Sequence, residues 1–180
     1  MKTRDLIYCA LFAALTAIGA FLQIPTGTVP ITLQFLFTAL AGLLLGWKWG
    51  AISQLLYGGI GLLGLPVFTQ GGGIGYVLQP SFGFLLGLIP AAAVIGALTA
   101  RRTGYLTVLA AVLVGDLILY AVGVPYMYLI LHVYMQSAKT FPALLAAMLV
   151  YVPGDTLKIV VVTALVPVLR RTLAKAVPNL

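Results

Sequence analysis

Charged side chains are scarce in this chain. Only 7% of its 180 residues are Asp, Glu, Lys or Arg, and just three of these are acidic. A soluble domain carries about 25% charged residues, and with so few it could not cover its surface. Hydrophobic residues make up 62% of the chain and the mean hydropathy is +1.15. The composition therefore predicts a polytopic membrane protein.

Cysteine, histidine and catalytic motifs are equally sparse. Cys9 is the single cysteine and His132 the single histidine, so no internal disulfide can form and no Cys/His metal cluster is expected. No GxxxxGK[ST], HExxH or GxSxG motif occurs, which argues against a Walker-type ATPase and two common hydrolase classes. The glycine run 71–75 lacks the βαβ context of a dinucleotide site. We expect neither a metal nor a cofactor.

The apolar residues form six runs with short connections between them. Their approximate limits are 5–23, 31–47, 49–64, 80–100, 104–123 and 142–169. A helix needs about 20 apolar residues to cross a bilayer. We therefore expect an all-α membrane protein with six transmembrane helices, in a single domain over residues 1–180. A tight turn is expected at 46–50, and close helix contacts at Gly83 and Gly87.

Basic residues are distributed unevenly between the predicted sides of the membrane. If the N-terminus is cytoplasmic, eight of them lie on the inner side and only Lys139 on the outer side. The inner set is Lys2, Arg4, Lys48, Arg101, Arg102, Arg170, Arg171 and Lys175. The positive-inside rule then predicts a multi-pass protein of the cell membrane with both termini cytoplasmic. The net charge of +7 thus indicates orientation and contact with membrane lipids, not a nucleic-acid surface.

The predicted outer connections are nearly uncharged and rich in turn-forming residues. They span 25–30, 65–80 and about 123–141, and a short interfacial helix is expected in the third. The second combines four glycines with an apolar composition. Non-helical backbone at membrane depth is tolerated only where protein buries it or where it lines a cavity. We expect this segment to cap a ligand pocket, with an ordinary exposed loop as the alternative.

Asp155 and Lys158 lie three residues apart within the last apolar run. This spacing places both side chains on one helical face, where they partly neutralise each other. Because a charge at the bilayer centre costs roughly 2.5–3.5 kcal/mol, the pair indicates a ligand or ion site, with a packing salt bridge as the alternative. The preceding Pro153-Gly154 pair is expected to loosen the helix and open backbone groups to a ligand.

A third buried charge, Asp116, lies at a similar depth. At a rise of about 1.5 Å per residue, Asp155 and Lys158 lie about 22 Å and 18 Å from Arg170, and Asp116 lies about 21 Å from Arg102. We hypothesise that the three groups face one cavity, with Lys158 shared between the two carboxylates. A protonated Asp116 that packs against another span is the alternative.

Five stretches of sequence, taken in order, resemble one family. They are Val29-Pro30-Ile31-Thr32-Leu33-Gln34, Gly64–Phe68 with the following glycines, Pro80–Gly87, Tyr120–Val124 and Pro153–Lys158. The family is that of the biotin-specific S components (BioY) of energy-coupling-factor (ECF) vitamin transporters. The resemblance covers essentially the whole chain. Gln79-Pro80-Ser81-Phe82 departs from the glycine-containing run that is usual in the family at this point.

The resemblance implies a six-helix substrate-binding subunit with a vitamin pocket near the outer face. Family members bind biotin through polar groups that include an Asp and a Lys at the positions of Asp155 and Lys158. A carboxylate can accept the ureido N–H groups of biotin, and an ammonium can hold a carbonyl or carboxylate oxygen. The other candidate ligand contacts are Gln34, Tyr76, Gln79, Ser81, Phe82, Asp116 and Tyr120.

Ala10 and Ala14 form a pair of small residues in the first apolar run. Small residues four apart allow a second helix to approach closely. In the family that the chain resembles, such an alanine motif docks the membrane-embedded coupling subunit, which two cytoplasmic ATPase subunits drive with ATP. Ordinary packing inside the bundle is the alternative.

These observations favour a high-affinity biotin-binding subunit of an ECF-type transporter, which is not an enzyme. An S component for a different vitamin is the near alternative. A small membrane-embedded enzyme that uses Asp116, Asp155 and Lys158 belongs to another class, as does a non-catalytic assembly partner. The last of these would leave the buried charges unexplained.

Overall fold

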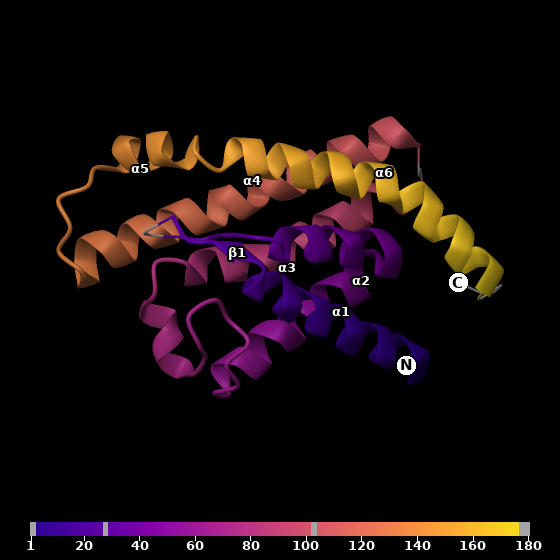
Figure 1. Cartoon of the computed structure of the whole chain (residues 1–180), viewed down its shortest axis with the longest axis horizontal. Helices are drawn as coiled ribbons and strands as arrows, with labels where there is room; N and C mark the ends of the chain where they lie inside the picture. Colours follow the sequence, from indigo (N-terminus) through magenta and orange to yellow (C-terminus); the bar gives the residue numbers. More distant parts are fainter. Residues whose placement is uncertain (1–2, 27–28, 102–103, 177–180) are drawn as a thin grey trace.

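The computed structural model describes residues 3–26, 29–101 and 104–176, most of which are helical. The α-helices are α1 (Thr3–Phe21), α2 (Gln34–Leu62), α3 (Phe82–Leu98), α4 (Tyr105–Leu129), α5 (Phe141–Met148) and α6 (Val152–Ala176). A 3-10 helix, η1 (Ile74–Leu78), and a π-helical turn, η2 (Ile130–Tyr134), join them. The bundle is elongated, with both chain ends at one end of it and α5 toward the other (Figure 1).

A short β-hairpin departs from the predicted all-α class. Strand β1 (Gln23–Ile24) pairs antiparallel with β2 (Ile31–Thr32), so that Gln23 lies opposite Thr32. The N–H of Leu33 donates to the carbonyl of Gly19 at 3.0 Å, which ties the hairpin to α1. These contacts fix the backbone from which Thr32 and the first turn of α2 face the interior.

Helix α2 folds back on itself at Gly46. This residue has φ 80° and ψ 178°, a conformation that glycine adopts without a Cβ clash. A Cβ on Gly50 would lie 2.9 Å from the Cα of Gly42, and Thr38 Oγ1 donates to Gln54 Oε1 at 3.0 Å. The two halves therefore run antiparallel and in contact, which confirms the turn predicted at 46–50.

Helices α3 and α4 approach each other closely at two glycines. A Cβ on Gly87 would lie 3.1 Å from the main-chain oxygen of Leu119, and one on Gly83 would collide with the side chain of Tyr126. The predicted role of Gly83 and Gly87 as helix contacts is confirmed.

The prediction that the fifth helix ends near residue 123 is wrong. Helix α4 continues through Pro125 to Leu129, and η2 extends the helical backbone to Tyr134. The phenol of Tyr126 donates to the carbonyl of Val77 at 2.6 Å. Because this contact and the packing against Gly83 require Tyr126 on the α3-facing side of a helix, tertiary packing outweighs the missing proline N–H.

The run 142–169 is not one helix, contrary to the prediction. Helix α5 ends at Met148, and α6 begins at Val152 after a short connection. Pro153 occupies the second position of α6, where a missing N–H costs nothing. The break therefore lies before the Pro153-Gly154 pair. Asp155 lies in the first turn of α6, where the helix dipole favours a carboxylate.

The segment between α2 and α3 folds over the bundle, as predicted. Phe68 is fully buried and Tyr76 is 4% exposed. The ring of Phe68 contacts Tyr57 and Tyr76 at centroid distances of 5.4 and 4.6 Å, and the N–H of Gly73 donates to the carbonyl of Gly61 at 2.7 Å. The segment 65–80 is therefore anchored to the bundle through Phe68 and Tyr76, while Leu65, Ile74 and Leu78 remain exposed.

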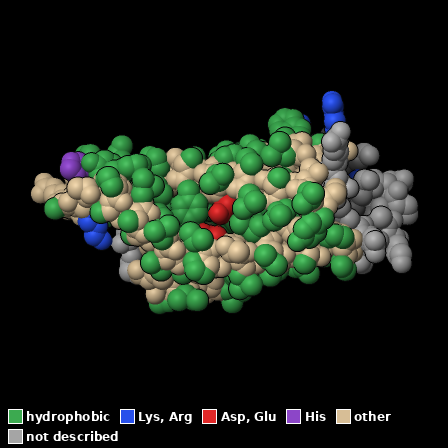
Figure 2. Space-filling model, turned by 90° about the horizontal axis from the view of Figure 1, so that it is seen from above, with side chains coloured by type: hydrophobic (Ala, Val, Ile, Leu, Met, Phe, Trp, Pro, Cys, Tyr) green, Lys and Arg blue, Asp and Glu red, His purple; other side chains and the backbone are tan. Residues whose placement is uncertain are grey.

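Among the described residues, four helices are long and apolar enough to cross a membrane. They cover Thr3–Phe21, Gln34–Leu62, Tyr105–Tyr134 and Val152–Leu169, and α3 is a shorter apolar helix. Hydrophobic side chains dominate the face shown in Figure 2, and acidic side chains are visible near its middle. Acidic groups thus lie within an otherwise apolar face.

Candidate functional site

A cavity lies among the hairpin, the first turns of α2, α3 and α6, and the second half of α4. Its volume is about 60 Å³. Its lining residues are Val29, Pro30, Ile31, Thr32, Gln34, Phe35, Thr69, Ser81, Phe84, Leu85, Leu88, Leu119, Tyr120, Met148, Tyr151, Asp155 and Lys158. We call it the ligand cavity. Five of the predicted contacts line it: Gln34, Ser81, Tyr120, Asp155 and Lys158.

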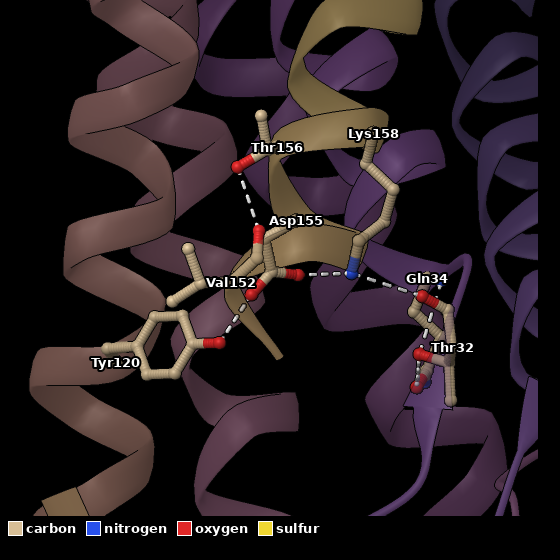
Figure 3. A network of polar contacts seen from close by, with 7 residues as sticks. All are labelled: Thr32, Gln34, Tyr120, Val152, Asp155, Thr156 and Lys158. Atoms are coloured by element: carbon tan, nitrogen blue, oxygen red, sulfur yellow. Dashed lines mark hydrogen bonds and ion pairs between the residues drawn. The ribbon is translucent and has the colours of Figure 1, made fainter. Parts of the chain in front are cut away.

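Asp155 and Lys158 form an ion pair in the wall of the ligand cavity (Figure 3). Lys158 Nζ lies 2.5 Å from Asp155 Oδ1, and it also donates to the main-chain oxygen of Thr32 at 3.3 Å. The hydroxyl of Tyr120 donates to Asp155 Oδ2. Both charged residues are less than one-tenth exposed. The predicted pairing on one helical face is confirmed, and strand β2 and helix α4 complete the cluster.

The charged cluster retains hydrogen-bonding capacity. An ammonium has three N–H donors, and Asp155 and Thr32 take two of them. A carboxylate has about four acceptor positions, of which Lys158 and Tyr120 occupy two. The pair can therefore offer one donor and further acceptors to a ligand while it stays neutral overall.

Gln34 extends the polar wall from the charged cluster toward α2. Its Oε1 accepts from Thr32 Oγ1 at 2.9 Å, and its Nε2 donates to the hydroxyl of Tyr57 at 2.7 Å. Tyr57 in turn donates to the carbonyl of Val67 at 3.1 Å. Gln34 is 6% exposed, so these partners set the orientation in which its amide meets the ligand cavity.

A second polar group lies where α3 begins. The hydroxyl of Tyr76 is hydrogen-bonded to Thr69 Oγ1 at 2.8 Å and to Ser81 Oγ at 3.3 Å. Thr69 and Ser81 line the ligand cavity, and Tyr76 supports both. Tyr76 itself therefore does not line the ligand cavity but lies behind Thr69 and Ser81, to which it is hydrogen-bonded. Thr69 was not among the predicted ligand contacts. The only sequence signal for it is its position just before the glycine run 71–75.

Three other predicted contacts do not line the ligand cavity. Gln79 is exposed. Phe82 is buried between Tyr76 and Tyr126, with ring centroids 6.4 and 5.9 Å away, so its ring fills the core. Asp116 is only partly buried.

Asp116 lies one turn before Tyr120 on α4, but Lys158 is not shared with it. The ion pair of Lys158 within the described chain is with Asp155. Asp116 Oδ1 is buried and has no hydrogen-bond partner among the described residues. It interacts electrostatically with Asp155 and Lys158. The depth comparison thus correctly placed Asp116 near the pair. The prediction that Lys158 is shared between Asp116 and Asp155 is wrong.

The apolar wall was largely missed from the sequence. It comes from the helices α3, α4 and α5, in Phe84, Leu85, Leu88, Leu119 and Met148. Phe84 meets the predicted Tyr120 edge-on at 6.0 Å. The spacing of Phe84 and Leu88, one helical turn apart, was the available signal. In so apolar a helix, every face carries such pairs.

Tyr151 connects two segments that line the ligand cavity. Its hydroxyl donates to the carbonyl of Val29 at 2.5 Å and is hydrogen-bonded to Thr26 Oγ1 at 2.9 Å. This contact links the hairpin loop to the connection between α5 and α6. Val29 and Tyr151 both line the ligand cavity, so this contact holds two parts of its wall together.

A separate apolar groove lies along α1 and the second half of α2. Its lining residues are Ala10, Ala13, Ala14, Ala17, Ile18, Leu56, Tyr57, Ile60 and Val67, and its volume is about 300 Å³. We call it the alanine groove. Ala10 and Ala14 are exposed there, whereas Ala13 is 4% exposed and packs inside the bundle. Packing inside the bundle, the alternative for the alanine pair, therefore applies to Ala13 and not to Ala10 or Ala14.

Comparison with known proteins agrees with the resemblance seen in the residues. The model of the BioY family matches residues 1–175. The "Probable biotin transporter BioY" of Lysinibacillus sphaericus is 54% identical over 142 residues, which cover 78% of this chain and 72% of that protein. The "Biotin transporter BioY" of Rhodobacter capsulatus is 40% identical over 186 residues, covering 98% and 96%.

A solved structure shares the fold. The S-component for biotin from an ECF-type ABC transporter superposes with a TM-score of 0.82 at 31% identity, over 95% of each chain. The protein therefore belongs to the BioY family.

Proposed function

We propose that this protein is a high-affinity biotin-binding subunit of an ECF-type transporter and mediates biotin uptake across the cell membrane. The observation that carries the proposal is the neutral Asp155–Lys158 pair, buried beside an apolar wall with hydrogen-bonding capacity to spare. Relatives that cover most of the chain are named biotin transporters.

The chemistry of biotin suits this cavity. Its ureido group offers two N–H donors and a carbonyl, which match the open acceptor positions of Asp155 and the free N–H of Lys158. Its compact apolar bicycle suits Phe84, Leu88 and the other apolar side chains. The hydroxyls of Ser81 and of Thr69 provide a further polar contact, suited to the carboxylate of the ligand.

Family membership sets aside the membrane-enzyme alternative, because the BioY relatives are named transporters. Among the described residues, no group of three or more His, Cys, Asp or Glu side chains could hold a metal. The second candidate is an S component for a different vitamin, and binding experiments distinguish it from a biotin-binding subunit.

We further propose six membrane crossings with both termini cytoplasmic. The antiparallel halves of α2 count as two crossings beside α1, α3, α4 and α6. An even number fits the position of both chain ends at one end of the bundle (Figure 1), and the positive-inside distribution gives the orientation. Basic residues at the inner border would contact lipid headgroups.

The proposed partners are an ECF coupling subunit and two cytoplasmic ATPase subunits, which would supply ATP hydrolysis. The solved relative is an S-component from an ECF-type ABC transporter, which supports this assembly. Ala10 and Ala14 are the proposed docking residues. They are exposed on α1 in an apolar groove, where small side chains let another helix approach closely.

Isothermal titration calorimetry on the detergent-purified protein tests the proposal. We expect saturable heat and thermal protection with biotin, and neither with riboflavin or thiamine. Lys158→Ala should abolish the heat, whereas Thr156→Ala, on the same helix but outside the cavity lining, should leave it unchanged. Absence of heat and of protection at micromolar biotin would exclude biotin as the ligand, and binding of another vitamin would establish the alternative.

A further inference from the structure

A hydrogen bond links a lining residue of the ligand cavity to a lining residue of the alanine groove. Gln34 lines the ligand cavity, and Tyr57 lines the alanine groove. Gln34 Nε2 donates to the Tyr57 hydroxyl at 2.7 Å, across 23 residues of sequence. This hydrogen bond therefore joins the wall of one cavity to the wall of the other.

Tyr57 passes this contact on to a second wall residue of the groove. Its hydroxyl accepts from Gln34 and donates to the main-chain oxygen of Val67 at 3.1 Å, and Val67 also lines the groove. A hydroxyl that accepts and donates at once is polarised by both partners, so a change at one bond alters the other. Gln34, Tyr57 and Val67 thus form a continuous chain from cavity to groove.

The Tyr57 ring has little freedom to absorb a displacement. It is 2% exposed and meets the fully buried Phe68 edge-on, with centroids 5.4 Å apart at 85°. Interiors are close-packed, so a side chain that shifts must move its neighbours. A displacement that begins at Gln34 is therefore delivered to the groove wall instead of being lost in a void.

The other end of the chain is next to the charged pair. Gln34 Oε1 accepts from Thr32 Oγ1 at 2.9 Å, and the carbonyl of Thr32 accepts from Lys158 at 3.3 Å. A ligand that accepts the third N–H of the Lys158 ammonium adds a partner to that group, and because neighbouring hydrogen bonds polarise one another, the bond from Lys158 to the Thr32 carbonyl changes. The change then reaches the Gln34 amide through one residue, Thr32.

We propose that Tyr57 couples the two cavities, so that occupation of the ligand cavity changes the shape of the alanine groove. Tyr57 acts here as a positioning residue, because it is separated from the ligand by Gln34. The proposal rests on the proposed function, since biotin serves as the probe. Coupling between binding sites is reciprocal, so a change in the groove must also change biotin affinity.

Fluorine NMR on the full-length protein tests the coupling directly. The parent is Cys9→Ala, with Ile18→Cys carrying a trifluoromethyl label. Ile18 lines the groove and is 52% exposed. The matched control labels Leu11→Cys, which is 50% exposed on the same helix and outside the groove lining. We expect saturating biotin to shift the Ile18 resonance and not the Leu11 resonance. Adding Tyr57→Phe should at least halve the Ile18 shift while calorimetry still detects bound biotin.

Two results would overturn the coupling: biotin binds but the Ile18 label does not shift, or Tyr57→Phe leaves the shift intact. Failure of the parent to bind biotin would instead contradict the proposed function. If Tyr57→Phe does not fold or bind, Ala17→Leu provides the reciprocal test, because the added side chain fills the groove beside Tyr57. Its biotin affinity should change at least about threefold. An unchanged affinity would exclude the coupling.

Discussion

Two regions of this bundle bury polar side chains, and they treat them differently. Between α1 and the two halves of α2 lies a polar cluster of Thr16, Thr38, Ser53 and Gln54, all at most 1% exposed. Gln54 Oε1 accepts from Thr38 at 3.0 Å, and its Nε2 donates to Thr16 at 3.3 Å and to Ser53 at 3.1 Å. Every member is neutral, and both N–H donors of the Gln54 amide are used.

The ligand cavity shows the opposite pattern. Asp155 and Lys158 are charged, and both keep hydrogen-bonding positions unused within the described chain. Satisfied neutral groups hold helices together, with small net energies in membranes. Unused hydrogen-bonding positions on buried charges do not stabilise the fold, because moving those charges out of water costs free energy that the unused positions do not offset. The contrast indicates architecture in the polar cluster and ligand binding in the cavity.

Asp155→Ala should have the largest effect. It leaves the Lys158 ammonium buried without its counterion, and breaking a buried pair costs about 3–5 kcal/mol. We expect biotin binding to be lost by more than about 100-fold and the thermal midpoint to fall, measured by calorimetry and by thermal unfolding in detergent. A variant that binds biotin like the parent would remove Asp155 from the site.

The double variant Asp155→Leu/Lys158→Met separates binding from stability. Replacing a buried ion pair with apolar side chains of similar volume is often neutral or stabilising by about 1–4 kcal/mol. We expect the thermal midpoint to equal or exceed that of the parent, while biotin binding is abolished. A large loss of stability would show that the pair is structural, and the comparison with the polar cluster would collapse.

Gln54→Ala should give the reverse result. It leaves Thr38 and Thr16 without a side-chain partner, and hydrogen bonds between membrane helices contribute about 0.6–1.7 kcal/mol. We expect a lower thermal midpoint with biotin affinity within about threefold of the parent. Ser53→Ala, which removes one bond of the same cluster, provides a milder control. A selective loss of affinity would place Gln54 in the binding function.

The sequence predicted the parts of this molecule that depend on composition and local chemistry. The helical membrane class, the turn at Gly46 and the Asp155–Lys158 pair each follow from a scarce or special residue type. A glycine with positive φ or a buried charge is costly unless the surrounding structure accommodates it, so such a residue restricts the structure around it. The sequence resemblance also identified the family, which the comparisons confirm.

The errors arose where tertiary packing decides. The extension of α4 past Pro125 depends on Tyr126 meeting Gly83 and Val77, and no local pattern encodes those partners. Phe82 and Phe84 are chemically alike and two residues apart, yet only Phe84 faces the ligand cavity. In a helix that is apolar on all sides, periodicity does not distinguish the cavity face from the core.

Asp116→Asn should have the smallest effect, and it tests where the ligand cavity ends. Asp116 interacts with the charged pair at a distance, and the attraction to Lys158 and the repulsion from Asp155 oppose each other. Its buried Oδ1 has no hydrogen-bond partner among the described residues, so a neutral amide of the same shape removes a desolvation cost. We expect the thermal midpoint to hold or rise, with biotin affinity changed by less than about threefold, since opposing contributions largely cancel. A loss beyond about tenfold, or about 1.4 kcal/mol, would mean that Asp116 contacts the ligand, and that the ligand cavity reaches further along α4 than its present lining.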